Sequence, residues 1–322
     1  MLLALALLPL QPAAASSAYH IVDLGTLGGL FGEAHGINSL GQVVGYSQPG
    51  PGVVHAFLWE KGVMTDLGTL GGQASLGLAI NNRGQVVGSS EAYPGSGALH
   101  AFVWENGVMT DLGTLGGPNS VAFGINDRGQ IVGWSNPPEG GNHAVLWENG
   151  TLTDLGTLGG RSSLAYGINA RGQVVGWSDV TSGGFHAFIW EDGVMTDLGT
   201  LGGSYSLAHA INARGQVTGE SPGPGSGGAF LWSGDALSDL GLLPGGTFSL
   251  GFAINARAQV VGYASDASGA SHAFIWQNGT MADLGTLSGD VASFAYAIND
   301  AGQIVGYSKD ASNNTRAVLW TK

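Results

Sequence analysis

The sequence predicts an all-β fold, a seven-bladed β-propeller with four antiparallel strands in each blade. The motif Asp-Leu-Gly-Thr-Leu-Gly-Gly recurs, whole or nearly so, with its Asp at positions 23, 66, 111, 154, 197, 239 and 283. This spacing of 42 to 45 residues is the length of one four-stranded blade. The 58 glycines stand at fixed places in the repeat beside Val, Ile, Trp and Phe, which is typical of short strands joined by tight turns. No segment has helical periodicity.

The repeat that starts at Leu207 accounts for each strand in order. An apolar run over 207–211 is the first strand, and Asn212-Ala213-Arg214-Gly215 predicts a type I turn with a glycine bulge. Residues 216–219 and 229–232 are the second and third strands. In other copies Asn106-Gly107 or its equivalent follows the third strand, a pair that favours a type I′ turn into a fourth strand that ends on the Asp-Leu-Gly motif.

The two ends of the repeat array complement each other. Residues 19–24 resemble a fourth strand without the first three, and residues 317–320 resemble a third strand without a fourth. We therefore expect the two segments to pair in one shared blade, which would close the ring and remove an exposed sheet edge.

The first strand of each repeat carries a small residue followed by a large one, as in Ala165-Tyr166. Successive strand residues point to opposite faces, so we expect each large side chain to fill space over a small residue of the next blade. The large residues are His35, Leu78, Phe123, Tyr166, His209, Phe252 and Tyr296.

Composition and the first residues restrict location and partners. Only 10% of the residues are charged and the net charge is −13, which argues against nucleic acid and anionic lipid as partners. The absence of cysteine excludes disulfides and thiolate zinc sites, and no cofactor motif is present. An apolar run over 2–10 followed by Ala13-Ala14-Ala15 resembles a signal peptide, residues 1–15, so we expect a secreted or periplasmic, monomeric, single-domain propeller over 16–322 without membrane insertion.

Third strands that begin with His-Ala-Phe, at His55, His100, His186 and His272, accompany Gly-Ile-Asn, Gly-Gln-Val-Val-Gly and Asp-Leu-Gly-Thr-Leu-Gly-Gly elements. This combination resembles the bacterial HAF-repeat extracellular proteins over essentially the whole chain after the signal segment. The resemblance implies a secreted repeat protein. The copies depart from the motif at Ala144-Val145, Gly228 and Arg316, so the histidine is not required in every blade.

The repeated Asp and His residues suggest metal sites, but simpler roles are favoured. The Asp is expected to accept backbone N–H groups of the following glycine-rich loop, because no calcium-loop pattern accompanies it. Third strands lie roughly 15 Å from the axis, which puts equivalent histidines on the order of 13 Å apart. Zinc needs its ligands at about 2.1 Å, so the histidines cannot share one ion. We expect each to bond within its own blade. They are His55, His100, His143, His186 and His272.

Five of the seven arginines fall in the turn between the first and second strands. In a propeller this turn shares a face with the hairpin after the third strand, where Glu60, Glu105, Glu148 and Glu191 stand. One interpretation is a belt of Arg–Glu pairs, each worth little. The other is an anion-binding mouth around the channel. The arginines are Arg83, Arg128, Arg171, Arg214 and Arg257.

The loop between the second and third strands, on the opposite face, varies most in length, and variable loops on a rigid scaffold commonly carry recognition. Aromatic residues precede it in five repeats. These rings either pack between blades near the rim or expose a face for stacking on a sugar or another flat ligand. The candidate ligand-binding residues are Tyr46, Trp134, Trp177, Glu220, Tyr263 and Tyr307; Ser89 takes this position in the remaining repeat.

We interpret the chain as a secreted binding module that presents one face to a protein, glycan or surface polymer. The alternatives are a lyase or hydrolase with its site at the channel mouth, and a structural cell-surface repeat. No nucleophile, zinc-protease or phosphate-binding motif favours catalysis. A single site should gather odd polar residues at one mouth, whereas a multivalent binder should repeat its site. The repeat with His209, Thr218, Glu220 and Gly228 departs most, so Glu220 and His209 are its titratable candidates.

Overall fold

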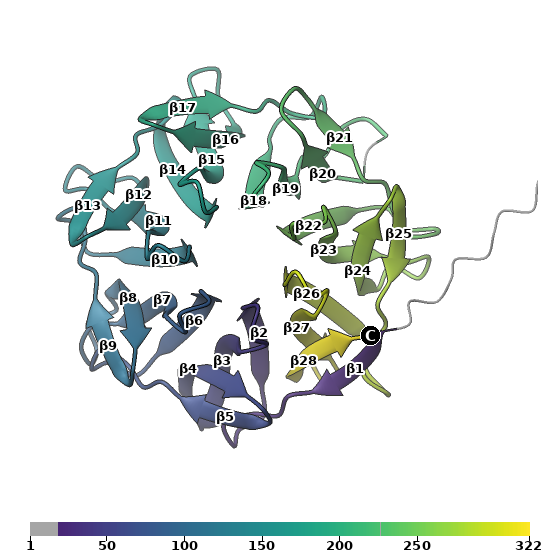
Figure 1. Cartoon of the computed structure of the whole chain (residues 1–322), viewed down its shortest axis with the longest axis horizontal. Coiled ribbons are helices and arrows are strands. Elements are labelled where there is room, and N and C mark those ends of the chain that lie inside the picture. Colours follow the sequence, from purple (N-terminus) through teal and green to yellow (C-terminus); the bar gives the residue numbers. More distant parts are fainter. Residues whose placement is uncertain (1–18, 226) are drawn as a thin grey trace, which may run out of the picture.

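The computed structural model describes residues 19–225 and 227–322, and within them it contains 28 strands and no helix. The strands form seven four-stranded antiparallel sheets arranged as blades around a central channel, which confirms the predicted propeller (Figure 1). The predicted signal segment lies outside the described residues. No helix long and apolar enough to cross a membrane occurs in the part of the chain that is described.

Each blade runs from an innermost strand beside the channel to an outermost strand at the circumference. The first three blades are β2 (Gly32–Ile37), β3 (Val43–Gly50), β4 (Val53–Glu60), β5 (Val63–Asp66); β6 (Ser75–Ile80), β7 (Val86–Glu91), β8 (Leu99–Glu105), β9 (Val108–Asp111); and β10 (Ser120–Ile125), β11 (Ile131–Ser135), β12 (His143–Glu148), β13 (Thr151–Asp154). Blades 4 and 5 are β14 (Gly159–Ile168), β15 (Val174–Val180), β16 (Phe185–Glu191), β17 (Val194–Asp197); and β18 (Leu207–Ile211), β19 (Val217–Glu220), β20 (Ala229–Trp232), β21 (Leu237–Asp239). Blades 6 and 7 are β22 (Ser249–Ile254), β23 (Val260–Ser265), β24 (Ser271–Gln277), β25 (Thr280–Asp283); and β26 (Ala292–Ile298), β27 (Ile304–Lys309), β28 (Thr315–Thr321), β1 (His20–Asp23).

The ring is closed by the two ends of the array, as expected. Strand β1 pairs antiparallel with β28, with His20 opposite Thr321 and Asp23 opposite Val318. The guanidinium of Arg316 on β28 lies 3.6 Å from the carboxylate of Asp23 on β1 and 2.5 Å from that of Asp290. The amino-terminal strand thus completes blade 7 through both backbone pairing and charge (Figure 1).

The turn residues adopt the backbone conformations that their sequence predicts. Asn106 and Gly107 both have positive φ, 52° and 85°, as a type I′ hairpin requires. The glycine of the first turn also has positive φ, for example 84° at Gly215. In blade 6 this position is Ala258, at φ 60°, so a side chain occupies a left-handed conformation that costs an L-residue about 1 kcal/mol.

The core consists of apolar layers between neighbouring blades. One layer joins Val44 and Ala56 of blade 1 to Val86 and Phe102 of blade 2, all of which are fully buried. Burying a phenylalanine ring in this way stabilises the fold by about 2–3 kcal/mol. Because every blade supplies one face to each of two layers, stability requires the complete ring.

Seven buried asparagines, one in each first turn, link the blades around the channel. The side-chain oxygen of Asn169 accepts the backbone N–H groups of Arg171 and Gln173, at 3.0 and 3.1 Å. Its amide nitrogen donates to the backbone carbonyl of Asn212 in the next blade, at 3.1 Å. The chain of bonds closes where Asn299 donates to Asn38. Its members are Asn38, Asn81, Asn126, Asn169, Asn212, Asn255 and Asn299.

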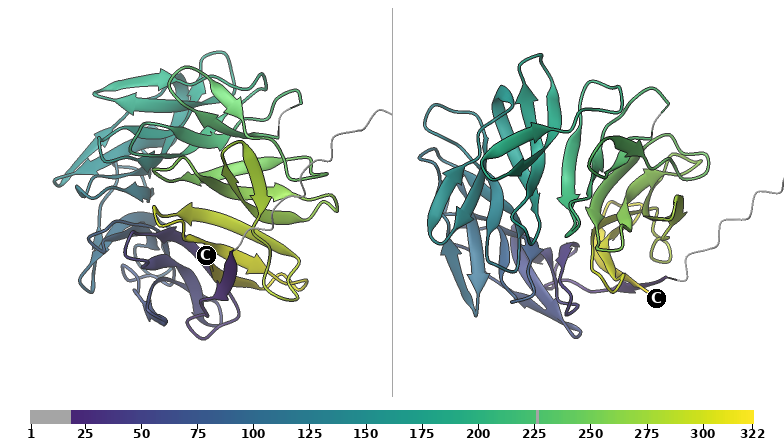
Figure 2. Two further views of the ribbon diagram at one scale, coloured as in Figure 1. Left: turned by 45° about the vertical axis from the view of Figure 1, so that its right-hand side comes forward. Right: turned by 45° about the horizontal axis from the view of Figure 1, so that its top comes forward.

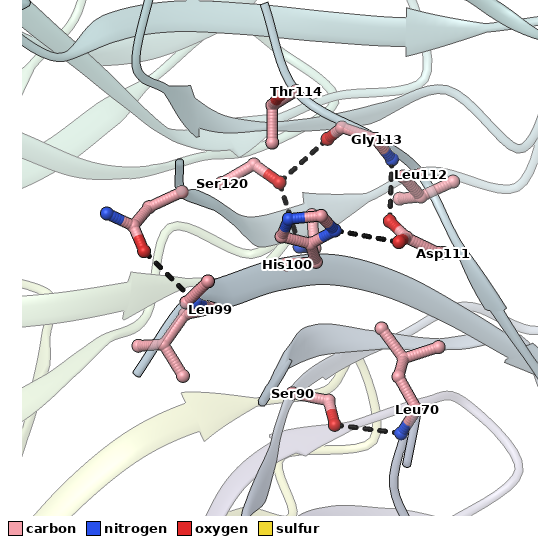
Figure 3. A network of polar contacts seen from close by, with 12 residues as sticks. Leu70, Ser90, Leu99, His100, Asp111, Leu112, Gly113, Thr114 and Ser120 are labelled. Carbon is pink, nitrogen blue, oxygen red and sulfur yellow. Dashed lines mark hydrogen bonds and ion pairs between the residues drawn. The ribbon is translucent and has the colours of Figure 1, made fainter. Parts of the chain in front are cut away.

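The repeated Asp and His residues stabilise the blade, as predicted. In Figure 3, Asp111 accepts the backbone N–H of Gly113 at 2.7 Å, and its other oxygen lies 2.7 Å from Nδ1 of His100. The same His–Asp contact occurs in blades 1, 3, 4 and 6. Arg316 takes the place of the histidine in blade 7.

Serines join six of the seven pairs of neighbouring blades, a role that the sequence analysis did not assign; between blades 7 and 1 the position is Gly32. The hydroxyl of Ser120 on β10 accepts the backbone N–H of Ala101 on β8 and donates to the carbonyl of Gly113 (Figure 3). The hydroxyls of Ser75, Ser163, Ser206, Ser249 and Ser293 accept the equivalent backbone N–H groups in five other pairs of blades.

Candidate functional site

The connections leave the ring on two opposite faces (Figure 2). We call one the turn face, because the first turns and the hairpins after the third strands meet there; Arg128 and Asn149 of blade 3 line one groove on it. The other, the loop face, carries the loops between second and third strands and the loops between blades. These two kinds of loop bond to each other, as where the backbone N–H of Gly29 donates to the carbonyl of Gln48.

A β-bulge in the innermost strand of every blade places its large residue differently from expectation. The register between first and second strands shifts at this residue, for example between Ala165 and Gly167. The bulge breaks the alternation of the strand, so the large side chain lines the central channel instead of covering a small residue of the next blade. These seven side chains, here called the channel ring, line a cavity of about 320 Å³ and are His35, Leu78, Phe123, Tyr166, His209, Phe252 and Tyr296.

Neighbouring members of the channel ring stack on one another. The rings of His35 and Tyr296 are 4.5 Å apart, and those of His209 and Phe252 are 4.7 Å apart, both nearly parallel. Tyr166 contacts His209 at 5.2 Å. Leu78 is the one member of the channel ring without an aromatic ring.

Four of the five aromatic residues that precede the loop between the second and third strands contact the channel ring from the loop face. Tyr263 also packs between blades, against Phe294 of blade 7 at 4.8 Å. We call this position in the seven blades the mouth layer: Tyr46, Ser89, Trp134, Trp177, Glu220, Tyr263 and Tyr307. The Tyr46 ring stacks on His35 at 4.9 Å, and that of Tyr263 on Phe252 at 5.6 Å. The indole N–H of Trp177 donates to the hydroxyl of Tyr166 at 3.3 Å. Most of the predicted ligand-binding residues therefore belong to one aromatic wall.

One carboxylate at this mouth, Glu33 on β2, is fully engaged by its neighbours. The hydroxyl of Tyr46 donates to it at 2.7 Å, and Nε2 of His35 lies 3.6 Å away. Burial alone would raise the pKa of Glu33, but the contact with His35 and the hydrogen bond from Tyr46 outweigh it, and the pKa is lowered. Glu33 is therefore held as a carboxylate.

The second carboxylate, Glu220 on β19, stands between Trp177 of blade 4 and Tyr263 of blade 6. Its side chain is half-buried, and in the described part of the chain it forms no hydrogen bond or ion pair. Burial raises the pKa of Glu220, and the Glu220 charge adds to burial in raising the pKa values of Tyr205, Tyr166 and Tyr263. The carboxylate therefore faces tyrosines from both flanking blades and receives no charge compensation.

The two histidines of the channel ring also lack hydrogen-bond partners. No described group bonds to Nε2 of His35 or of His209, although both atoms are buried. Burial lowers the pKa of His209 to about 4, so this imidazole is neutral at pH 7.

The arginines of the first turns lie in grooves between blades on the turn face. Arg83 and Arg128 line a groove of about 500 Å³, and Arg171 and Arg214 line another of about 300 Å³. The mouth of the channel on this face is lined by the asparagine ring and its neighbours, and none of the five arginines lines it. Three of the hairpin glutamates bond to glutamines, as Glu148 does to Gln130 at 2.8 Å, and Glu60 pairs with Lys61, so the described arginines form no Arg–Glu belt.

The loop-face mouth thus gathers the polar residues that break the repeat. Glu220 and His209 were singled out from the sequence. Glu33 was missed, although it is a charged residue at a position that is apolar in the other repeats, such as Leu164 and Phe294. The contribution of Tyr205 could not be read from the repeat, because it lies in a loop between blades. This arrangement favours one asymmetric site over seven equal sites.

No protein-family model matches the chain, and no curated protein matches its sequence. Among solved structures it is similar to the β-propeller domain of the Trilobed protease from Pyrococcus furiosus, with a TM-score of 0.57 and 10% identity over 90% of this chain and 95% of that one. That domain has an open velcro topology, whereas β1 closes the ring here.

Two further similar structures are larger proteins. A puromycin hydrolase matches with a TM-score of 0.57 and 14% identity, over 95% of this chain and 54% of that one. A puromycin-hydrolyzing peptidase from Mycobacterium tuberculosis matches with a TM-score of 0.55 and 14% identity, over 86% of this chain and 48% of that one. This chain therefore spans about half the length of both enzymes. At these identities the likeness shows the propeller fold alone.

Proposed function

We propose that the chain is an extracellular binding module without catalytic activity, whose ligand sits at the loop-face mouth of the axial channel. The observation that supports it best is the wall of aromatic side chains from Tyr46, Trp177, Tyr263 and Tyr307, which contact the channel ring from the loop face beside the carboxyl groups of Glu33 and Glu220. Stacked aromatic faces beside a few polar groups suit a ligand with one flat apolar face and several hydroxyl groups, such as a glycan or surface polymer.

The test is a screen of glycans and surface polymers against the protein over 16–322, with two aromatic variants. Trp177→Ala removes part of the wall and should weaken binding about tenfold or more, because one stacked ring is worth on the order of 1–2 kcal/mol. Tyr93→Ala is the matched control, since Tyr93 is 61% exposed in the β7–β8 loop of the same face. Equal binding by the two variants would contradict the assignment of the ligand to this mouth.

A second candidate, hydrolysis or elimination at the same mouth, is favoured by one observation. The surroundings lower the pKa of Glu33 and raise that of Glu220, and two carboxyl groups whose pKa values are shifted apart are a common arrangement in general acid–base catalysis. Incubation of any glycan found in the screen, followed by chromatography of the products, tests this. Product formation that disappears in Glu220→Gln would support an enzyme; an intact glycan would support the binding module.

A further inference from the structure

The loop-face mouth contains a feature that a site for neutral sugars alone would not need. Glu220 occupies the mouth-layer position that is aromatic in both neighbouring blades, Trp177 and Tyr263. A carboxylate in this half-buried place loses part of its hydration, which is costly unless a partner compensates it. The protein supplies no partner, since Glu220 forms no hydrogen bond or ion pair in the described residues.

The contrast with Glu33 shows that the fold can satisfy a carboxylate in this channel. Glu33 lies in the channel wall as well, and there the Tyr46 hydroxyl and the His35 imidazole contact its oxygens. Glu220, in blade 5, has Tyr166, Tyr205 and Tyr263 as neighbours from blade 4, the preceding loop and blade 6. None of their hydroxyls bonds to it. The lack of a partner is therefore particular to Glu220 and is not a general property of carboxylates in this channel.

The surroundings of Glu220 are aromatic on several sides. Trp177 is bonded to Tyr166 and lies 5.3 Å from the ring of Phe185, which in turn lies 5.0 Å from Tyr205. Trp177 and Phe185 belong to blade 4 and Tyr205 to the loop before blade 5, whereas Tyr263 lies on β23 of blade 6, the blade on the other side of β19. Aromatic faces carry negative electrostatic potential and attract cations.

The overall charge acts in the same direction. The net charge of the chain is −13, and its ten basic residues are three lysines and seven arginines. The five first-turn arginines lie toward the turn face, and Arg316 is bound to Asp290 and Asp23 in blade 7. Arg161, on the loop face, lies beside Gly140 and Gly141 of the β11–β12 loop. No basic side chain contributes to the pKa of Glu220. An anionic ligand is therefore disfavoured at this mouth, and a cationic group is favoured.

We propose that the ligand carries an organic ammonium group, which binds between the aromatic rings of blades 4 and 6 with Glu220 as its counter-ion. A quaternary or primary ammonium would contact the ring faces of Trp177, Tyr205 and Tyr263 and would return to Glu220 the charge compensation that the fold leaves out. This inference rests on the proposed binding function and specifies the chemistry of its ligand: an amino sugar polymer, or a polymer substituted with an alkylammonium group, fits, and a uronic acid polymer does not.

The experiment compares two small probes of the same shape, choline and its uncharged isostere 3,3-dimethylbutan-1-ol. Titration of the protein at pH 7, followed by calorimetry or by the NMR signals of the probe, measures both affinities. We expect choline to bind at least about tenfold more tightly than the alcohol, because only the cation gains from the rings and the carboxylate. In Glu220→Gln the preference should shrink to the part that the aromatic rings alone provide, while affinity for the alcohol stays unchanged.

Glu139→Gln is the matched control, since Glu139 is an exposed carboxylate in the β11–β12 loop of the same face and its loss changes the net charge equally. The choline preference should survive in this variant. Equal affinity for the two probes, absence of choline binding at millimolar concentration, or a preference as large in Glu220→Gln as in the unchanged protein would each overturn the inference. Unchanged thermal unfolding of Glu220→Gln confirms that the variant is folded.

The results also separate this inference from the proposed function. If a neutral glycan binds in a way that depends on Trp177 while choline does not bind, the binding function stands and the ammonium specificity is wrong. If neither the glycan and polymer screen nor choline yields binding that depends on the mouth residues, both are wrong.

Discussion

The ring of buried asparagines makes a quantitative prediction for stability. The side chain of Asn169 is only 4% exposed and forms four hydrogen bonds: it accepts two backbone N–H groups and donates to Gln173 and to the carbonyl of Asn212. Each such bond contributes about 1 kcal/mol net, and buried partners left unpaired add to the loss. We therefore expect Asn169→Ala to lower the free energy of unfolding by about 4 kcal/mol.

A matched control stands in the turn of another blade. The exposed Asn82 also bonds to the neighbouring blades, accepting from Ser39 and donating to Asp127. Water can replace these bonds, so Asn82→Ala should cost less than about 1 kcal/mol. Equilibrium unfolding in guanidinium chloride, followed by tryptophan fluorescence, measures both variants. Equal losses for the two variants would refute the claim that burial gives the asparagine ring its strength.

Three further predictions concern single side chains. Burial lowers the pKa of His209 to about 4, so between pH 6.5 and 4 only the unfolded chain binds this proton. The free energy of unfolding should therefore decrease as the pH is lowered through this window, by at most about 3 kcal/mol and by less because the ring borders the channel. Unfolding curves measured at several pH values should lack this part of the decrease in the His209→Phe variant. Ala258→Gly should raise the free energy of unfolding by about 0.5–1 kcal/mol, because glycine adopts a φ of 60° without strain. Gly84→Ala, where φ is 78°, should lower it by a similar amount. If denaturant titrations show both variants to be more stable, or both less stable, the backbone at Ala258 is not strained. Arg316→Ala should cost about 3 kcal/mol, because the carboxylate of Asp290 is 1% exposed and would lose its cation; near-complete recovery on adding Asp290→Asn is expected, and a loss under about 1 kcal/mol would disprove the role of this ion pair.

The sequence predicted the architecture because the features that specify it are local and repeated. Asn-Gly pairs fix the hairpins through positive φ at both turn residues, as Asn106 shows, and the 42–45-residue period fixes the number of blades. The closure of the ring could also be predicted, since an unpaired fourth strand at one end and an unpaired third strand at the other allow one arrangement without an exposed edge. The His100–Asp111 contact was predictable as a bond within one blade, because third and fourth strands are adjacent.

The content of the channel was decided by tertiary structure. A bulge depends on how the innermost strand fits beside its neighbours, so the alternation of small and large residues suggested the wrong direction for Tyr166 and its equivalents. The neighbours of Glu220 were also decided by tertiary structure. Tyr205 comes from a loop and Tyr263 from the next blade, and the arrangement of the blades in a ring brings both to the same mouth. By itself, the sequence determined the blades and their turns, because backbone conformation and strand pairing are set by neighbours along the chain. Which side chains meet at the axis followed from ring geometry, because contacts between neighbouring innermost strands join residues more than 40 positions apart, as with Tyr166 and His209.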